Sequence, residues 1–224
     1  DFADQPGLAA DLRESSGRVH EALGLYAGAE RTLARVVDWR QSVLGPRDPA
    51  TLRARRAHAS VLRQLSRYDE ARTLLEAALA DASALAPDDE TRGMLELELS
   101  EVQALQGDLP GARAAKQALL ARLEPSRGGE DRLVLQVKSG LAMHMARMGD
   151  LPEARAMFEE VLATRRRLLG DDHADTVASM SALAIALAMH GQSHDAVELQ
   201  RQVVAVQERR LGSEHPDTLA ARGN

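Results

Sequence analysis

Four arginines and a serine share one face of a predicted helix, in a pattern that suits anion binding. They recur at steps of 3, 4, 3 and 4 residues and are Arg53, Arg56, Ser60, Arg63 and Arg67. Residues at such steps form one stripe along an α-helix. Because a guanidinium group can hold a carboxylate through two parallel hydrogen bonds, the stripe predicts a site for an acidic peptide segment. The alternative is a solvated charged face whose arginines pair with nearby acids such as Asp69 and Glu70.

The other polar residues do not assemble into a catalytic, nucleotide or metal site. His190 and His194 have the i, i+4 spacing of a zinc-binding helix, but Gly191 interrupts that helix and no third ligand is near. Gly128-Gly129 lacks the Gly-Lys-Ser/Thr of a phosphate-binding loop. The chain has no cysteine, which removes thiolate ligands and a cysteine nucleophile. We therefore expect no enzymatic activity, no metal and no cofactor within these residues.

A ladder of small residues with a period of about 42 predicts the elements that position the polar groups. One column of the ladder consists of Gly24, Ser66, Gly107, Gly149 and Gly191. Five residues after each of these comes an alanine, at Ala29, Ala71, Ala112, Ala154 and Ala196. Seven residues before each comes another small residue, at Gly17, Ala59, Ser100, Ala142 and Ala184. A fixed period of this length predicts stacked supersecondary units.

Within one period the apolar spacing predicts two amphipathic helices joined by a tight turn, with small residues where the helices cross. The predicted fold is therefore all-α: a right-handed α-solenoid of about five helical hairpins that forms a single domain over residues 1–224. The expected repeats are 8–45, 49–86, 88–124, 131–170 and 173–212, followed by the start of a truncated sixth repeat at 215–224.

This pattern resembles the tetratricopeptide repeat (TPR). The period of 42 and the turn Leu211–Thr218 are similar to the longer variant found in kinesin light chains. Repeats of that variant often carry paired asparagines on the first helix, and here only Asn224, beside Gly223, matches. The segment from Asp4 to Tyr26 resembles the start of the repeat region in some bacterial serine/threonine kinases.

The resemblance implies that the first helices of the pairs line a concave groove for a partner. The register of the arginine stripe relative to Ala59 predicts that the stripe faces this groove. Chaperone-binding members of the family clamp an acidic carboxyl terminus; Arg56 matches one of their basic positions, whereas Ser60 stands where an asparagine is expected. Met143 and Met189 either adapt to ligand side chains or pack between helices. The remaining predicted groove residues are Glu101, Gln136, Ser139, Met143, Arg147, Ser181 and Met189.

Composition narrows the class of partner. The formal net charge of -6 and the sequence pI of about 5.7 argue against a nucleic-acid binder. The few aromatic residues are scattered, so no stacking platform for single strands is visible. No apolar run approaches the ~18–20 residues that span a membrane, and the first residues lack the basic and apolar regions of a signal peptide. We therefore expect neither nucleic acid nor a membrane as partner, and a cytoplasmic location.

The expected function is a scaffold module that binds a protein or peptide segment, within a larger bacterial signalling protein. One alternative is an intramolecular sensor or regulatory arm of a multidomain kinase or STAND-type ATPase. Another is a structural oligomerisation element, because an uncapped terminal repeat exposes apolar surface. That alternative predicts self-association through the truncated repeat at 215–224.

Overall fold

The computed structural model describes residues 6–223, and within this range the chain is helical throughout apart from turns. Asp4 and Gln5, in the segment that resembles the kinase repeat region, and Asn224 of the kinesin-light-chain pattern lie outside the described residues. The helices are α1 (Pro6–Ala22), α2 (Tyr26–Val43), α3 (Pro49–Gln64), α4 (Tyr68–Asp81), the 3-10 turn η1 (Ala82–Ala84), α5 (Glu90–Leu105), α6 (Leu109–Arg127), α7 (Arg132–Met148), α8 (Leu151–Leu169), α9 (Ala174–Met189), α10 (Ser193–Leu211) and α11 (Pro216–Gly223).

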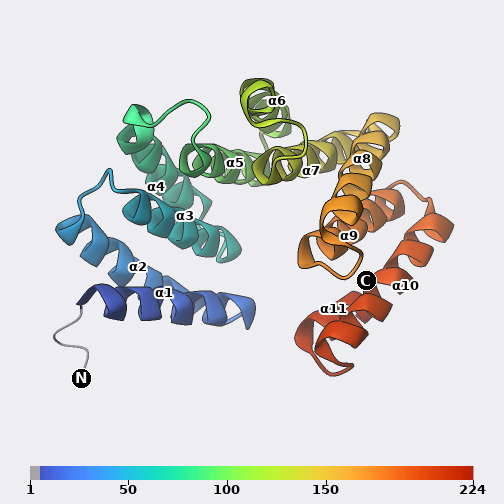
Figure 1. The fold of residues 1–224 in the computed structure, drawn as a ribbon, viewed down its shortest axis with the longest axis horizontal. Helices are drawn as coiled ribbons and strands as arrows, with labels where there is room; N and C mark the ends of the chain where they lie inside the picture. The colour runs from blue at the N-terminus through green and yellow to red at the C-terminus, as the bar shows by residue number, and fades with distance from the viewer. Residues whose placement is uncertain (1–5, 224) are drawn as a thin grey trace. The chain divides into compact units, whose positions relative to one another are not determined.

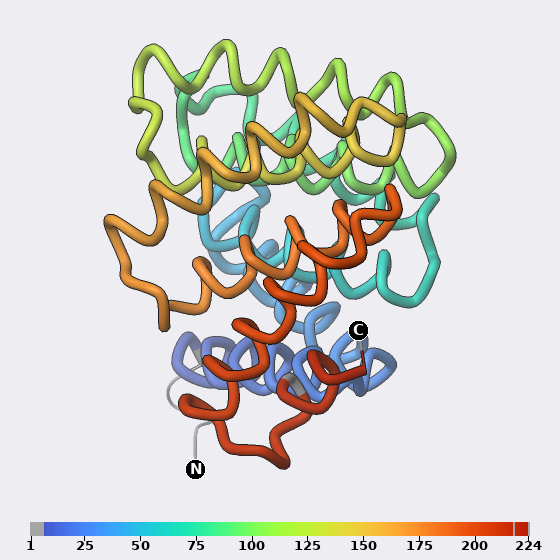
Figure 2. The backbone as a smooth tube through the Cα atoms, turned by 90° about the vertical axis from the view of Figure 1, so that its right-hand side faces the viewer, coloured from blue at the N-terminus to red at the C-terminus, as the bar shows by residue number. Residues whose placement is uncertain are grey.

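The chain divides into two compact units, residues 1–115 and 116–224, with the division inside α6. In the first unit each helix from α1 to α5 packs on the next, and α3 also contacts α5 (Figure 1). In the second unit each helix from α7 to α11 packs on the next, and α7 also contacts α9 (Figure 2). Within each unit, first helices of successive pairs therefore lie against one another, as α3 and α5 and α7 and α9 do. The predicted all-α stack of helical hairpins is confirmed.

Side-chain caps start the first helix of a pair. The Asp48 carboxylate accepts a hydrogen bond from the backbone N–H of Ala50 at 2.8 Å, and Asp89 and Asp131 cap α5 and α7 in the same way. At α9 the imidazole of His173 takes this role, because its Nδ1 accepts from the N–H of Asp175 at 3.1 Å. The residues before α2, α4, α8 and α10 make no such bond. The recurring turn between pairs is thus a set of capping motifs, which satisfy otherwise unpaired N–H groups.

Backbone geometry explains the first column of the ladder. Each of its members follows the first helix of a pair and has a positive φ: 72° at Gly24, 59° at Ser66, 98° at Gly107, 98° at Gly149 and 75° at Gly191. An L-residue in this left-handed region costs roughly 1–2 kcal/mol because its Cβ crowds the backbone, whereas glycine has no Cβ. The turn inside each hairpin therefore favours glycine, and Ser66 is the one strained member.

Close helix packing explains the other two columns. All five alanines of the second column are buried, with 0 to 6 % of their surface exposed. In the third column, a Cβ added to Gly17 would lie 3.0 Å from two side-chain atoms of Leu33, which is tighter than ordinary contact. Small side chains at these positions allow the backbones of paired helices to approach.

One polar pair interrupts the core of the second unit. Lys116 on α6 is 0 % exposed, and its Nζ lies 3.4 Å from Nδ1 of the buried His144 on α7. The corresponding positions one or two periods away are the fully buried Leu33, Leu75 and Phe158. The third repeat thus departs from the apolar pattern of its neighbours at a core position.

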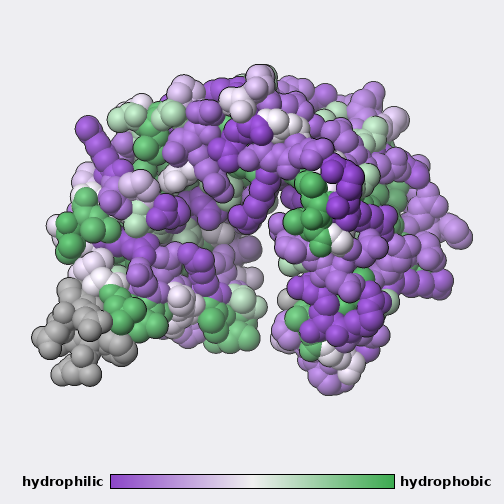
Figure 3. Space-filling model, in the orientation of Figure 1, coloured by the Kyte–Doolittle hydropathy of each residue, from purple (hydrophilic) through white to green (hydrophobic). Residues whose placement is uncertain are grey.

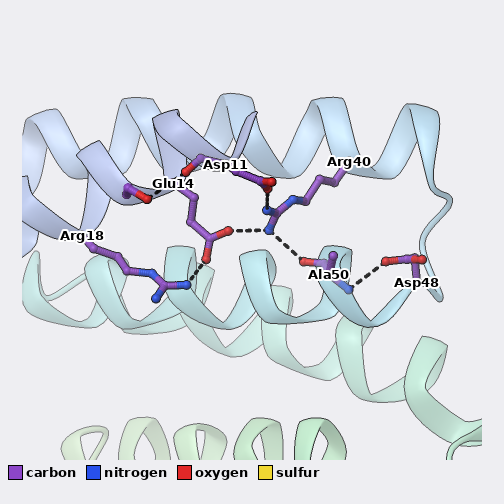
Figure 4. A network of polar contacts seen from close by, with 7 residues as sticks. Asp11, Glu14, Arg18, Arg40, Asp48 and Ala50 are labelled. Atoms are coloured by element: carbon purple, nitrogen blue, oxygen red, sulfur yellow. Dashed lines mark hydrogen bonds and ion pairs between the residues drawn. The ribbon is translucent and has the colours of Figure 1, made fainter. Parts of the chain in front are cut away.

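A buried arginine joins the first three helices. Arg40, near the end of α2, donates from Nη1 to the backbone carbonyl of Ala50 at 3.2 Å. Its Nη2 lies 2.7 Å from Oδ1 of Asp11, and its Nη1 lies 2.5 Å from Oε2 of Glu14, both on α1 (Figure 4). Glu14 also pairs with Arg18. Burial opposes the charge of Glu14, but the two arginines outweigh this effect and lower its pKa. The charge of Arg40 is therefore neutralised inside the unit.

Replacing Ser66 with glycine should stabilise the chain. Ser66→Gly removes the left-handed strain and is expected to raise the free energy of unfolding by about 0.5–1 kcal/mol. Gly149→Ser is the matched reverse change: an added Cβ meets nothing within 4 Å there, so only the backbone penalty acts, and we expect a loss of about 1 kcal/mol. Urea unfolding measures both. A shift of the same sign in the two variants would contradict this explanation of the ladder.

Removing the Glu14 carboxylate should destabilise the first unit. Glu14→Gln leaves Arg40 with Asp11 alone, at an expected loss of about 1–3 kcal/mol at neutral pH. Because the pKa of Glu14 is lower in the folded state, its contribution is complete above the ordinary value of 4.5 and disappears as the pH falls through the folded value. The difference from the parent chain should therefore shrink in acid.

Urea unfolding at neutral and acidic pH tests the role of Glu14. Glu76→Gln is the control, because Glu76 forms an exposed pair with Arg72 on α4 and should contribute little. Equal losses in the two variants at neutral pH would show that the Glu14 network is no stronger than a surface pair.

Candidate functional site

In the first unit, the predicted arginine stripe is shorter than expected and only partly neutralised. Arg53, Arg56, Ser60 and Arg63 lie on α3, whereas Arg67 follows the end of that helix, in the turn before α4. Arg63 donates from Nε to Oε1 of Glu98 on α5 at 2.8 Å. Arg67 donates to both carboxylate oxygens of Glu70 at 2.6 Å. Ser60 donates to Oε1 of Glu21 on α1 at 3.1 Å. The C-terminal half of the stripe is therefore hydrogen-bonded to acidic side chains within the unit.

Arg53 and Arg56, in the first two turns of the stripe, behave differently. Arg53 is exposed and Arg56 is half-buried. Neither forms an ion pair or a hydrogen bond within residues 6–223. Two guanidinium groups three residues apart thus remain available on the face of α3.

Electrostatics distinguish the two halves of the stripe. Burial alone would lower the pKa of Arg63, but the adjacent Glu98 carboxylate outweighs it and raises that pKa, with Glu101 on α5 adding to the effect. The hydrogen bond to Glu70 raises the pKa of Arg67. Both cations are therefore held by internal acids. The pairing expected of Glu70 is present, whereas Asp69 accepts instead from the side chain of Gln106 at 2.7 Å.

In the second unit, two predicted groove residues line a polar pocket. Gln136 and Ser139 on α7 border a pocket of about 310 Å³ between α7, α8 and α9. Its other lining residues are Arg132, Arg165, Asp175, Ala178, Ser179 and Ala182. One polar group of the lining already has a partner within its own helix: the hydroxyl of Ser139 donates a hydrogen bond to the backbone carbonyl of Leu135 at 3.0 Å.

The remaining predicted groove residues of the second unit lie outside this pocket. Met143 is half-buried and packs against the hydrophobic core, as the packing alternative expects. Met189 is 52 % exposed at the end of α9, and Arg147 is exposed at the end of α7. Ser181 on α9 is half-buried. The structure therefore brings together Gln136 and Ser139, but gathers the other four into no common pocket.

Arg165, a buried cation that lines the pocket, was not predicted from the sequence. Arg165 on α8 is 8 % exposed, and its Nη1 donates to Oγ of Ser179 at 2.6 Å and to the carbonyl of Asp175 at 3.1 Å. No carboxylate among residues 6–223 forms an ion pair with it. Burial lowers its pKa, and the nearby Arg132 adds to this shift. Its spacing from Arg40, close to three periods of the ladder, was the signal that could have identified it.

The histidines do not gather into a metal site. The described part of the chain holds no group of three or more His, Cys, Asp or Glu side chains suited to a metal ion. His190 is engaged elsewhere, because its Nε2 lies 2.7 Å from the carbonyl oxygen of Ala146. None of the described helices combines the length and the apolar character needed to cross a lipid bilayer.

Comparison with known proteins agrees with the helical pairs. Residues 8–84 and 131–209 match a tetratricopeptide-repeat family profile, and residues 94–115 match a second profile of that description. No curated protein matches the sequence.

Several solved structures share the fold. One is a kinesin light chain protein from Podosopora anserina with nearly identical TPR-like repeats, which is 25 % identical with a TM-score of 0.62, covering 90 % of this chain and 96 % of that one. BtubC (BKLC) from P. vanneervenii is 18 % identical with a TM-score of 0.67, covering 96 % and 87 %. PlcR from Bacillus thuringiensis, solved with the peptide PapR7 and DNA, is 10 % identical with a TM-score of 0.70, covering 96 % and 72 %. The family profiles and the paired helices together place the chain in the tetratricopeptide-repeat family.

Proposed function

We propose that this chain is a scaffold module that binds a protein or peptide segment, with preference for acidic segments, along the first helices of its pairs. The carrying observation is the pair of arginines on α3, Arg53 and Arg56, which no described residue neutralises. Internal acids hold Arg63 and Arg67 of the same stripe, so the available charge is confined to one half of the helix. We propose that the remaining residues predicted for the groove also contribute to binding the partner.

The fold supports such a role. Within each unit, the packed hairpins present their first-helix faces already formed, which reduces the ordering that binding requires of the protein. PlcR, which shares the fold, was solved with a bound peptide. We propose that this module acts by binding rather than by catalysis, takes no nucleic acid, and works in the cytoplasm within a bacterial signalling protein.

Binding of acidic peptides should depend on the α3 arginines. Synthetic peptides rich in Asp and Glu, compared with the same peptides carrying Asn and Gln, provide the probe. We expect Arg53→Ala with Arg56→Ala to weaken binding of the acidic peptides by about tenfold or more, because each charge-assisted hydrogen bond contributes about 1.5–3 kcal/mol. Raising the salt concentration should weaken binding in the parent chain.

Arg72→Ala is the matched control, because Arg72 is an exposed arginine on α4 that pairs with Glu76. Fluorescence anisotropy gives the affinities. Equal affinity for acidic and neutral peptides, or an unchanged affinity in the double variant, would overturn the role of the α3 arginines.

We propose self-association as a second function, favoured by two apolar surfaces. The first is a groove of about 620 Å³ in the second unit, lined mainly by α9 and α10 with Ala221 and Arg222 of α11. The second is formed by the exposed Leu12 and Val19 on α1 and by Leu23, directly after the end of that helix. Figure 3 shows hydrophobic patches where α1 lies in Figure 1. The proposed occupant of the groove is α1 of a second copy.

The repeat register supports this pairing. A step of 42 residues leads from Leu12, Val19 and Leu23 to positions 54 and 61 of α3 and to position 65 directly after it, all of which pack on α2. The groove residues 196, 200 and 204 follow by 167 residues the α2 positions 29, 33 and 37. The α1 surface thus corresponds to the face of α3, and the groove to the face of α2, that pack together in the first unit. Docking in this register competes with α11, which covers the beginning of the groove.

Sedimentation velocity over a range of concentrations tests the head-to-tail contact. The parent chain should associate as concentration rises, because a copy bound through one half of a heterologous contact still offers the other half to a further copy. Val19→Glu and Val197→Glu should each be monomeric alone, and their mixture should stop at a one-to-one dimer. Leu169→Glu, at an exposed position outside both surfaces, should behave as the parent chain does. A parent chain that stays monomeric throughout would exclude this function.

A further inference from the structure

The joint around Arg165 in the second unit repeats the joint around Arg40 in the first. Arg165 follows Arg40 by 125 residues, three steps of the ladder. Each arginine donates from Nη1 to the carbonyl of the residue ten positions ahead, Ala50 for Arg40 and Asp175 for Arg165. Both side chains are buried. The two sites are therefore equivalent positions of one repeated structure.

The two joints differ in how the buried charge is neutralised. The same step of 125 residues leads from Asp11 to Gln136 and from Glu14 to Ser139. The two carboxylates that hold Arg40 thus have neutral residues in their places on α7. The pocket of about 310 Å³ lies where these neutral residues face Arg165. The second unit has an open space where the first has two carboxylates.

The charges around the pocket leave one cation in excess. Arg165 has no ion pair within the described residues, and the 75 % exposed Arg132 lies only loosely beside Asp175, at 3.8 Å between Nε and Oδ2. Asp175 is the one carboxylate that lines the pocket, against two guanidinium groups. A buried charge without a counter-charge is unfavourable, and an arginine keeps its proton rather than becoming neutral. An anion in the pocket would relieve this.

We propose that the pocket between α7, α8 and α9 binds a carboxylate group of a peptide ligand. This inference deepens the proposed function and rests on it. Arg165 is the anchor, Arg132 closes the rim, and the amide of Gln136 can donate a further hydrogen bond. The first unit supports a carboxylate in particular, because the equivalent space there is filled by the carboxylates of Asp11 and Glu14.

A variant that restores the internal acids tests this assignment without any peptide. Gln136→Asp with Ser139→Glu rebuilds on α7 the pair found on α1, so the chain should fill its own pocket. We expect its melting temperature to exceed that of the parent chain. Sodium acetate, titrated against sodium chloride at constant ionic strength, should raise the melting temperature of the parent chain and not that of the double variant, because only an open site binds the anion.

Arg132→Gln covers the case in which the double variant fails to fold. Arg132 is exposed, so this change should leave the fold intact while it reduces the acetate effect. Arg53→Ala with Arg56→Ala alters α3 in the other unit and should leave the acetate effect unchanged. Loss of the acetate effect in both would point to nonspecific charge and overturn the assignment.

Peptides identify the source of the carboxylate. If the anchor is a carboxyl terminus, amidation of that terminus should weaken binding about tenfold or more, and Arg132→Gln should remove the difference between acid and amide. If the anchor is a side chain, replacing Asp and Glu by Asn and Gln in the peptide should weaken binding instead, and Arg132→Gln should remove this difference. Either result supports the pocket.

The two proposals fail in different ways. If no peptide binds but acetate still stabilises the parent chain selectively, the scaffold function fails and the anion site stands. If peptides bind but acetate has no selective effect and Arg132→Gln leaves peptide affinity unchanged, the pocket is not the carboxylate site.

Discussion

Close contact between paired helices is the constraint on which the rest of the structure depends. Each hairpin must turn within a few residues and then bring its second helix against its first. Glycine in the left-handed region makes the turn, and a buried small residue on each helix allows the approach. Leu33, which meets Gly17 at the limit of contact, shows how little space remains. Within each unit the first helices of neighbouring pairs then lie side by side, α3 against α5 and α7 against α9.

Buried arginines at the joints between pairs connect this framework to function. Arg40 stabilises its joint because carboxylates from a third helix neutralise it. Arg165 makes the same hydrogen bond to the start of the next helix, but neutral residues stand in place of the two carboxylates that neutralise Arg40. A charge that folding leaves without a partner destabilises the free protein and strengthens the attraction for an anionic ligand. One repeated position can thus stabilise the fold in one unit and provide a binding site in the other.

The arginine stripe on α3 shows how far a helical pattern predicts a site. The spacing predicted five side chains on one helix, but α3 ends at Gln64, so it carries only four of them and Arg67 follows in the turn before α4. The spacing also could not distinguish available cations from engaged ones. Arg63 pairs with Glu98, 35 residues away on another helix. Periodicity reports neighbours three or four residues apart on one helix, not the residues that face it from the next pair. For the same reason the spacing could not identify Arg165. This arginine is unneutralised because Gln136 and Ser139, on another helix, carry no carboxylate.

The sequence by itself determined the helical class, the pairing of helices and the capped turns between pairs. These depend on local requirements that recur every 42 residues: a backbone angle that glycine tolerates, a side chain small enough for a crossing, and a cap for free N–H groups. Only the tertiary structure decided which charges remain available and where a pocket lies. Neutralisation depends on distances of a few ångströms between side chains far apart in the chain, and packing alone sets those distances.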